Sequence, residues 1–445
     1  MASEAVGIVR FQLGFRSAIA RMPAVRLAVL SAAILTAVAV IPYLPFFKLA
    51  HISDDYLQIE LGRKYGPIAH WRELAGDALY RCRATSIVLT NWTERWAGVA
   101  SATFQAESVA LHILNTLLIA ALGWWSPIGW RLAAVAAGFF ALHEGHQEAV
   151  VWYAALPELL VFFFAMLSLH AWLAWVESEG RSRWAYAAAL LAFVMALLSK
   201  ESAVAVVPLM LGTAYVSGKR PLGEAITGLV PFAVLSAAYA ASIFAAKETH
   251  LHLNDGTFSA ASPVAEVVAR STFRLLWIWG VAALAYLAYR RSLDRFLVVG
   301  SLVWIVVTLL PYSFLSYMPH VPSRHVYWAS VGLAFLVAGA LSKLLDGGPG
   351  LRRVAYALAT VIFVHNTGYL WIRKLPQYER RVAPTEKLVR YAQQVTGPIT
   401  IKCFPYGHEI AALTLHLRAG RSKESTRWDP QAAAGPSVYC DTDQP

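Results

Sequence analysis

Residues 24–47 read AVRLAVLSAAILTAVAVIPYLPFF, and this apolar run decides the class of protein to which the chain belongs. A basic stretch that contains Arg10, Arg16 and Arg21 precedes it, as in a secretory signal peptide. The run is too long for a signal core of ~7–15 residues. About 20 helical residues, in contrast, cross the hydrocarbon core of a bilayer. We therefore expect a retained first transmembrane helix, with the N-terminus in the cytoplasm.

Apolar runs of comparable length recur along most of the chain. Of the 445 residues, 58% are hydrophobic and 15% are charged, whereas a soluble domain carries about 25% charged residues. The sequence therefore predicts an all-α polytopic membrane protein, embedded in a lipid bilayer. Besides the first, the expected spans are 98–122, 130–150, 151–175, 224–246, 267–289, 295–312, 327–345 and 352–372.

Residues 184–216 form two shorter apolar runs on either side of Ser199-Lys200-Glu201. Basic residues flank the pair on both sides, and the positive-inside rule places both flanks in the cytoplasm. The segment therefore crosses the membrane twice or not at all. Two short helices that meet at Lys200 and Glu201 on the outer side fit best, with a re-entrant hairpin as the alternative. The total is then about eleven transmembrane helices.

Eleven crossings place the basic loop residues in the cytoplasm and leave few of them outside. Residues 1–373 then form the membrane domain, with a large first outer loop at about 48–98. Residues 374–445 form a small extracytoplasmic appendage, with a helix near 379–394 and a strand at 399–403. The only cysteines in this tail are Cys403 and Cys440. The net charge of +11 is spread over the loops, so we do not expect nucleic-acid binding.

Polar residues cluster at two places near the expected spans. Four of them fall on one stripe of the second helix. This stripe either forms a structural polar contact between helices or lines a substrate cavity. They are Gln105, Ser108, His112 and Asn115. Residues 143–148 carry two histidines and two glutamates. A zinc protease motif needs histidines at i and i+4, whereas His143 and His146 are three residues apart. We expect no metal there, and either a satisfied interfacial cluster or contacts with a substrate.

An acidic pair, Asp54 and Asp55, directly follows the first helix, and the basic pair Arg63 and Lys64 lies beyond it. Adjacent carboxylates near a boundary of low dielectric have split pKa values. One of them is then suited to accept a proton and the other to orient it. The neighbouring basic side chains are suited to hold a phosphate.

Together these stretches resemble the GT-C superfamily of polytopic glycosyltransferases, and above all the bacterial relatives of the TPR-containing O-mannosyltransferases, without their TPR part. The resemblance covers about residues 40–330. It rests on five motifs in the same order, which are Asp54-Asp55-Tyr56, Phe104-Gln105-x-x-Ser108-x-x-x-His112-x-x-Asn115, His143-x-x-His146-x-Glu148-Ala-Val-x-Trp152, Leu198-Ser199-Lys200-Glu201 and Ser323-Arg324-His325-Val326-Tyr327.

The resemblance implies a GT-C-like bundle that transfers a sugar from a polyprenyl-phosphate donor to a glycan, lipid or protein acceptor outside the bacterial inner membrane, with inversion. Asp54 is the expected general base and Asp55 its partner or alternate. Lys200 and Arg324 are expected to bind the donor phosphate, followed by Arg63 and Lys64. No cofactor is required, although some members of the superfamily use a divalent metal. The residues expected to shape the sugar or acceptor pocket are His112, His143, His146, Glu148, Glu201 and Tyr327.

Two other classes of protein share these features. A transporter or flippase of a lipid-linked or amphipathic solute also places His and Glu at membrane depth, where they relay protons. The chain shows no inverted repeat and no matched pair of broken helices, and its polar residues gather toward one side of the membrane. A polymerase or ligase of lipid-linked glycans is the third candidate.

Overall fold

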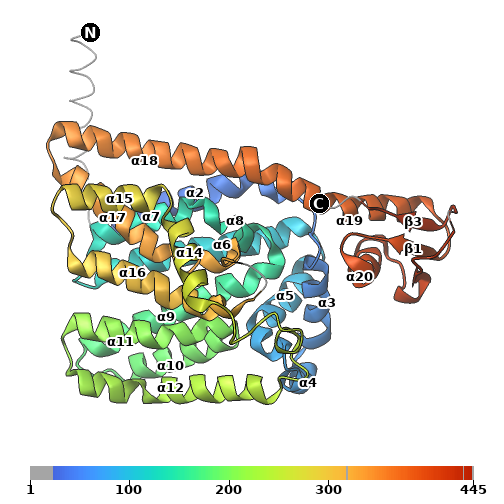
Figure 1. The fold of residues 1–445 in the computed structure, drawn as a ribbon, viewed down its shortest axis with the longest axis horizontal. Coiled ribbons are helices and arrows are strands. Elements are labelled where there is room, and N and C mark those ends of the chain that lie inside the picture. The colour runs from blue at the N-terminus through green and yellow to red at the C-terminus, as the bar shows by residue number, and fades with distance from the viewer. Residues whose placement is uncertain (1–23, 317–318, 434, 443–445) are drawn as a thin grey trace, which may run out of the picture.

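The computed structural model describes residues 24–316, 319–433 and 435–442, so the basic stretch with Arg10, Arg16 and Arg21 lies outside it. Most helices run side by side along the long axis of the molecule, and a small appendage projects from one end (Figure 1). The helices of the bundle are α2 (Ala24–Val40), α6 (Ser101–Ala121), α7 (Trp130–Leu142), α9 (Leu156–Glu177), α10 (Arg183–Leu197), α11 (Val206–Ser217), α12 (Leu222–Ala245), α14 (Val264–Leu276), α15 (Trp279–Tyr289), α16 (Arg295–Leu309), α17 (Ser330–Asp346) and α18 (Pro349–Tyr369).

Five helical stretches within the described residues are long and apolar enough to cross a membrane, and a bent pair makes a sixth if it counts as one span. The protein is therefore a membrane protein. The five are Arg26–Lys48, Ser101–Trp124, Tyr153–Glu177, Leu222–Ala245 and Arg295–Phe314. Each of the eleven expected segments contains a helix, but α7, α10 and the stretch Glu201–Ser217 are shorter. The expected count of eleven spans is not confirmed.

The bent pair lies where one continuous span, 267–289, was expected. Helices α14 and α15 meet at 78°, at Ile278, whose φ of +67° is rare for a β-branched residue. The sequence gives a reason, because α14 carries a charged face on which Glu266 and Arg270 form an ion pair one turn apart. A helix with such a face does not continue the apolar α15 through lipid.

Three helices fill the first outer loop: α3 (Asp55–Tyr65), α4 (Trp71–Gly76) and α5 (Ala84–Ala97). Helices α3 and α5 pack closely because glycine removes a side chain at the contact. A Cβ added to Gly66 would meet the Asn91 side chain at 2.2 Å. The amide of Gln58 on α3 also donates to the Thr90 hydroxyl on α5 at 3.1 Å. This unit lies at the same end of the bundle as the appendage (Figure 1).

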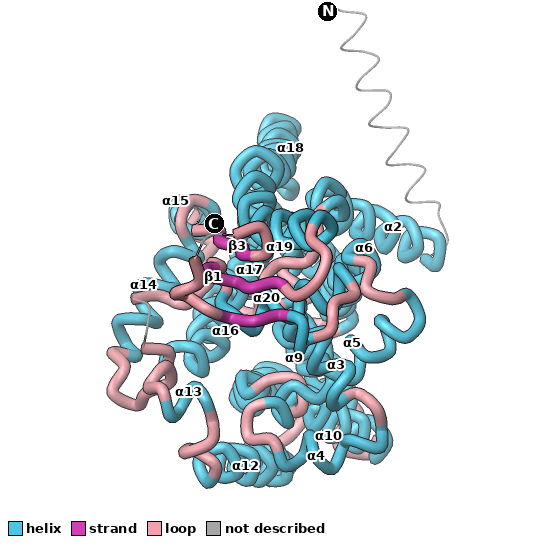
Figure 2. Tube along the Cα trace, turned by 90° about the vertical axis from the view of Figure 1, so that its right-hand side faces the viewer, coloured by secondary structure: helices cyan, strands magenta, loops and turns pink. Residues whose placement is uncertain are grey.

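The appendage is a small α/β unit, and its expected helix and first strand are confirmed. Strand β1 (Ile399–Cys403) pairs in parallel with both β2 (Thr426–Trp428) and β3 (Val438–Cys440). Helix α19 (Leu375–Gln394) continues the line of α18, and α20 (Gly407–Ala419) follows β1. Figure 2 shows the strands crossing in front of the end of the bundle.

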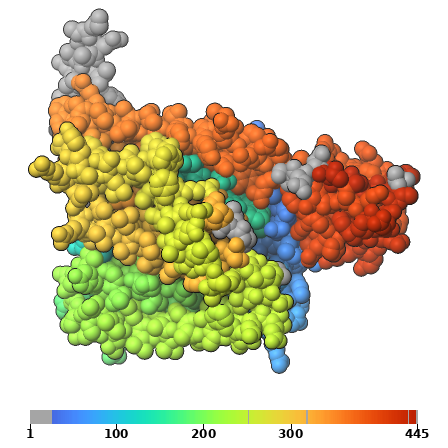
Figure 3. All heavy atoms as spheres, in the orientation of Figure 1, coloured from blue at the N-terminus to red at the C-terminus, as the bar shows by residue number. Residues whose placement is uncertain are grey.

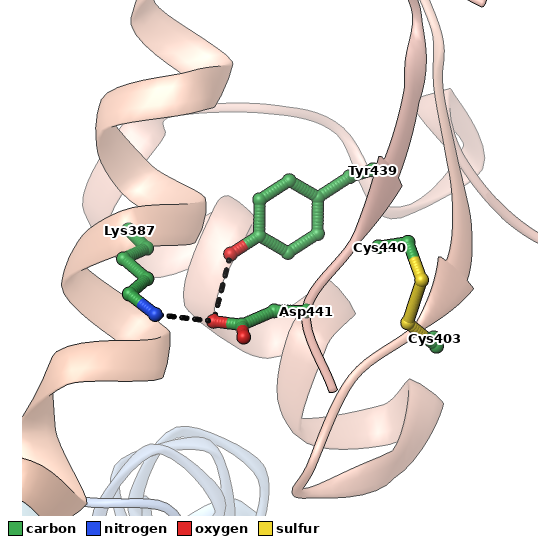
Figure 4. Close-up of a disulfide and its surroundings, with 5 residues drawn as sticks. All are labelled: Lys387, Cys403, Tyr439, Cys440 and Asp441. Carbon is green, nitrogen blue, oxygen red and sulfur yellow. Dashed lines mark hydrogen bonds and ion pairs between the residues drawn. A yellow bond between two sulfur atoms is a disulfide. The ribbon is translucent and has the colours of Figure 1, made fainter. Parts of the chain in front are cut away.

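A disulfide between Cys403 and Cys440 joins β1 to β3 (Figure 4). Beside it, Lys387 of α19 pairs with Asp441 at 3.4 Å, so the end of the sheet is tied to the helix. The appendage stands out as a separate mass at one end of the molecule (Figure 3). Lys423 nevertheless forms an ion pair with Glu60 of α3, which connects the appendage to the first outer loop.

Candidate functional site

A cavity of about 500 Å³ lies among residues from widely separated parts of the chain. Its volume falls within the range of ordinary small-molecule sites, about 300–1,000 Å³. Four residues singled out from the sequence line it together: Asp54, Lys200, Glu201 and Arg324. Its other polar lining residues are Arg83, Trp152, Glu158, Ser202, Tyr239, His250, His252, Thr257, Tyr312 and His325.

The two neighbouring aspartates at the start of α3 have different surroundings. Asp54 lines the cavity and accepts a hydrogen bond from the Ser53 hydroxyl at 3.0 Å. Asp55 is buried, and its two carboxylate oxygens accept backbone hydrogen bonds from Ile52 and Ala154, each at 2.8 Å. Burial raises the pKa of Asp55 to about 7, although the hydrogen bonds from these two amides lower it in part. Asp54 is therefore placed to contact a ligand, whereas Asp55 holds the turn before α3 against the backbone of Ala154.

A buried network centred on Glu158 forms one wall of the cavity. One carboxylate oxygen of Glu158 pairs with Lys200 and lies 2.6 Å from Nδ1 of His325. The other oxygen accepts from the Tyr312 hydroxyl at 2.6 Å, and that hydroxyl lies 2.8 Å from Ser202 Oγ. Burial lowers the pKa of Lys200 to about 8, while Glu158 acts to raise it. Lys200 is thus a cation that pairs with Glu158 and lines the cavity.

A second ion pair joins Arg83 of the first outer loop to Glu201 at 2.7 Å. Both residues line the cavity. Although burial raises the pKa of Glu201, Arg83 and then Lys200 lower it below its ordinary value. Glu201 is therefore an anion, and it holds Arg83 in the cavity wall.

Arg324 forms the third pair at the cavity, with Glu148 at 2.7 Å. The same carboxylate also accepts from the Ser323 hydroxyl at 2.6 Å, so the turn before α17 is fixed to residue 148. The Arg324 guanidinium lies 5.1 Å from the ring centre of Trp152, and the guanidinium of Arg381 from α19 lies 4.9 Å from the same ring. Two cations thus flank a tryptophan that lines the cavity.

The polar stripe of α6 does not line the cavity, and the structural alternative fits its surroundings. His112 Nδ1 lies 2.8 Å from the Tyr327 hydroxyl, which also accepts from Asn115 at 3.2 Å. His146 Nε2 lies 2.7 Å from Ser330 Oγ. All five residues are buried. His112, His146 and Tyr327 therefore lie outside the wall of this cavity, in a buried polar seam between α6 and the turns that follow α7 and precede α17.

The remaining predicted residues also lie outside the cavity wall. His143 Nδ1 is 3.2 Å from the Glu144 carboxylate, at the turn after α7. Arg63 is held by Glu94 at 2.5 Å, and Lys64 lies over the ring of Tyr65 at 4.4 Å. Glu148 reaches the cavity only through Arg324. The phosphate-binding role expected of Arg63 and Lys64 therefore finds no support in their positions, since their neighbours are on the outer helices.

The cavity has an apolar part beside the charged groups. It is formed by the end of α12 and by the segments on either side of residues 258 and 314. The apolar residues are Ala240, Ile243, Phe244, Leu253, Phe258, Phe314 and Leu315. Among the described residues, no group of three or more His, Cys, Asp or Glu side chains is placed to hold a metal ion.

Sequence reasoning missed several groups in this wall, above all Glu158, Arg83 and Tyr312. A signal for Glu158 is present, since it is the one carboxylate in the first turn of the apolar helix α9. An ionisable side chain at membrane depth marks a functional candidate. Arg83 and Tyr312 have no such signal, because an arginine in a loop and a tyrosine after a span are ordinary.

No family model matches the chain, and no curated protein matches it in sequence. Among solved structures, the crystal structure of the Archaeoglobus fulgidus oligosaccharyltransferase, tethered with an acceptor peptide through a disulfide bond, is similar with a TM-score of 0.49 and 12% identity. The alignment covers 88% of this chain and 63% of that one, so the chain spans less than two thirds of that enzyme's length. A likeness this weak leaves the function to be decided by the site itself.

Proposed function

We propose that the protein is a GT-C type membrane glycosyltransferase of the bacterial inner membrane. It transfers a sugar from a polyprenyl-phosphate donor to a glycan, lipid or protein acceptor on the extracytoplasmic face, with inversion. The observation that carries the proposal is the composition of the cavity wall. Three carboxylates, three cations and an apolar patch line a single cavity. Glu158 and Glu201 pair with the cations Lys200 and Arg83, which leaves Asp54 for the acceptor, and Arg324 is the third cation. A lipid phosphate that carries a sugar needs all three kinds of contact.

Asp54 is the general base of the proposed reaction. Its carboxylate removes the proton from the acceptor hydroxyl while the hydroxyl oxygen attacks the anomeric carbon. The bond from that carbon to the donor phosphate breaks, and the phosphate leaves with the electron pair. A positioned base contributes typically ~10²–10⁴-fold to such a step. Asp55 supports the base by holding the turn through its two backbone hydrogen bonds.

The three cations meet the negative charge that grows on the departing phosphate. Each already has a carboxylate partner, which are Glu201 for Arg83, Glu158 for Lys200 and Glu148 for Arg324. Such pairs hold the cations in place before the donor arrives, so little reorganisation is needed in the transition state. The mechanism requires no metal, because the cations supply the positive charge.

The test is turnover of a sugar-charged polyprenyl phosphate by purified protein in lipid vesicles. The wild-type protein should release polyprenyl phosphate, which mass spectrometry detects directly. Asp54→Asn should lower the rate about 10²–10⁴-fold, because the amide cannot accept the proton. Asp346→Asn is the matched control, since Asp346 pairs with Arg131 at an exposed site and does not line the cavity.

Three outcomes contradict the proposal in different ways. A folded Asp54→Asn variant with unchanged turnover removes Asp54 as the base. Wild-type protein that binds the lipid and moves it between leaflets with the sugar still attached identifies a transporter or flippase instead. Growth of the lipid-linked glycan by whole repeat units identifies a polymerase or ligase.

A further inference from the structure

Two histidines in the cavity wall belong to none of the charged pairs. His250 and His252 lie in the segment 246–263, which connects α12 to α14 and contains the short helix α13 (Leu251–Asn254). Both line the cavity, and their ring centres are 6.0 Å apart. Figure 2 places α13 between α12 and α14 at the edge of the bundle.

The segment is fixed to the opposite edge of the cavity. The amide of Ser316 donates to the Thr257 carbonyl at 2.8 Å, and the amide of Ser259 donates to the Phe314 carbonyl at 2.9 Å. These bonds form a short antiparallel bridge between Phe258 and Leu315. Thr257, Phe258 and Phe314 line the cavity too, so these bonds hold the segment that carries the histidines in the cavity wall.

Both rings carry buried nitrogen atoms without a partner in the described part of the chain. His250 is 5% exposed, and neither its Nδ1 nor its Nε2 is hydrogen-bonded. Nδ1 of His252 is in the same state. Buried polar groups are nearly always satisfied in folded proteins. Because both residues line the cavity, a ligand that bonds to these nitrogens would approach them from that side.

The protonation state of the histidines indicates which hydrogen-bonding groups the ligand offers. Burial lowers the pKa of both rings. At His250 the negative charge of Glu201 opposes this shift, and the positive charge of Arg83 adds to it at both residues. Both are therefore neutral at pH 7. A neutral imidazole has one nitrogen that donates and one that accepts. A hydroxyl group matches this pattern, since it also donates and accepts, whereas a phosphate oxygen can only accept and is better met by Lys200 or Arg324.

We propose that His250 and His252 bind the hydroxyl groups of the donor sugar and thereby distinguish the sugar-charged lipid from bare polyprenyl phosphate. This inference rests on the proposed function. It adds which residues of the cavity bind the phosphate of the donor and which bind its sugar. The cations Arg83, Lys200 and Arg324 bind the phosphate, and the segment 246–263 binds the sugar. A neutral surface for hydroxyl groups and a cationic surface for phosphate then share one cavity.

The test compares two lipids in one experiment. The full-length protein is incubated with a total lipid extract that contains both bare and sugar-charged polyprenyl phosphate, and the retained lipids are quantified by mass spectrometry. Wild type should enrich the sugar-charged species over the bare one by about tenfold or more. His250→Phe with His252→Phe should lose this enrichment and still retain the bare lipid. His250→Gln with His252→Gln, which keeps neutral donors and acceptors, should recover part of it.

His408→Phe is the control, because His408 is exposed in the appendage and does not line the cavity. The inference is overturned if the double Phe variant enriches the sugar-charged lipid as strongly as wild type, or if it loses the bare lipid equally. Wild-type protein that retains neither lipid contradicts the proposed function itself, and the inference with it. Wild-type protein that retains both lipids without preference contradicts the inference alone.

Discussion

Neighbouring residues of like chemistry have opposite surroundings at the start of α3. Asp54 borders the cavity, while Asp55 is buried and bonded to the backbone of Ala154, 99 residues away. Successive residues at the beginning of a helix point about 100° apart, so a pair of identical side chains cannot share one site there. The division of labour that the sequence suggested for the pair therefore has a geometric cause.

Asp55 should make the stability of the protein depend on pH. Its carboxyl has an ordinary pKa of 3.8 in the unfolded chain, and burial raises its pKa to about 7 in the folded protein. Between these values the folded state holds a proton that the unfolded state has lost. The free energy of unfolding should therefore fall as the pH rises from about 4 to about 7, and this contribution should be level above that range.

Asp55→Asn removes the titrating group, so this slope should disappear. The variant should be less stable than wild type at acidic pH, because an amide can accept only one of the two backbone bonds. This difference should shrink or reverse above about pH 7, where wild type has lost the stability of the protonated carboxyl. Thermal unfolding in detergent, followed by the fluorescence of the 16 tryptophans, measures both effects. Asp54→Asn is the control and should keep the slope. An unchanged slope in Asp55→Asn would show that another group causes it.

Glu158 holds the cavity wall together at the residue scale. Glu158→Gln should destabilise the protein by about 3–5 kcal/mol, because Lys200 then loses its counterion while its side chain stays only 12% exposed. Glu158→Gln combined with Lys200→Met removes both charges and should restore much of the unfolding temperature without restoring turnover. Glu177→Gln, at the exposed end of the same helix, should leave the unfolding temperature unchanged. Equal unfolding temperatures for the single and double variants would exclude this coupling.

At the scale of elements, the ends of the helices matter more for the site than their middles. Helix α7 ends at Leu142, where a longer span was expected, and the chain then makes three short turns before α9 begins. These turns bring Glu148 and Trp152 to the cavity edge. Beyond the bend between α14 and α15, helix α14 lies beside the loop before α17, because the amide of Val321 donates to the Ser271 hydroxyl of α14 at 3.0 Å.

The disulfide is an element-scale feature, because it closes the small sheet of the appendage. Cys403 and Cys440 are 37 residues apart, and such a link typically contributes 2–4 kcal/mol. Cys403→Ser with Cys440→Ser should therefore make the appendage more sensitive to trypsin, while the bundle stays intact. Gel electrophoresis with mass spectrometry of the fragments measures this. Cys82→Ser should behave as wild type, since Cys82 is not in a disulfide. Equal cleavage rates in all three proteins would contradict a stabilising role.

At the scale of the whole molecule, the cavity, the first outer loop and the appendage share one end of the bundle. Helix α18 runs along the bundle and continues into α19, so it connects the two ends (Figure 1). The lipid carrier and the acceptor would therefore meet on one side of the membrane. The positive-inside rule predicts that this side is extracytoplasmic.

Cysteine labelling tests that orientation, although the natural Cys82 is unsuitable because it is buried. Gln431→Cys places a thiol on the exposed surface of the appendage, and Gly348→Cys places one in the exposed turn before α18, where an added side chain meets nothing. An impermeant maleimide should label Gln431→Cys in intact cells and Gly348→Cys only after lysis. The reverse pattern would invert the orientation and remove the extracytoplasmic site.

The sequence by itself determined the class of the protein and the nature of its segments. A helix and a strand follow from local periodicity and apolarity, so α19, β1 and the long apolar helices were predictable near their actual bounds. Asp54, Lys200 and Arg324 were also expected on one side of the membrane, because the basic loops set the orientation of the spans between them.

Only the tertiary structure decided which side chains meet. Glu158 bonds Tyr312 across 154 residues, and Glu148 holds Arg324 across 176. His112 lies inside the bundle and bonds to Tyr327 because α6 packs against α2, α7 and α9, which a single stripe of polar residues could not reveal. Local patterns fix the elements because a helix depends on neighbours three and four residues away. The cavity depends on contacts between segments far apart in the chain, and packing alone selects those contacts.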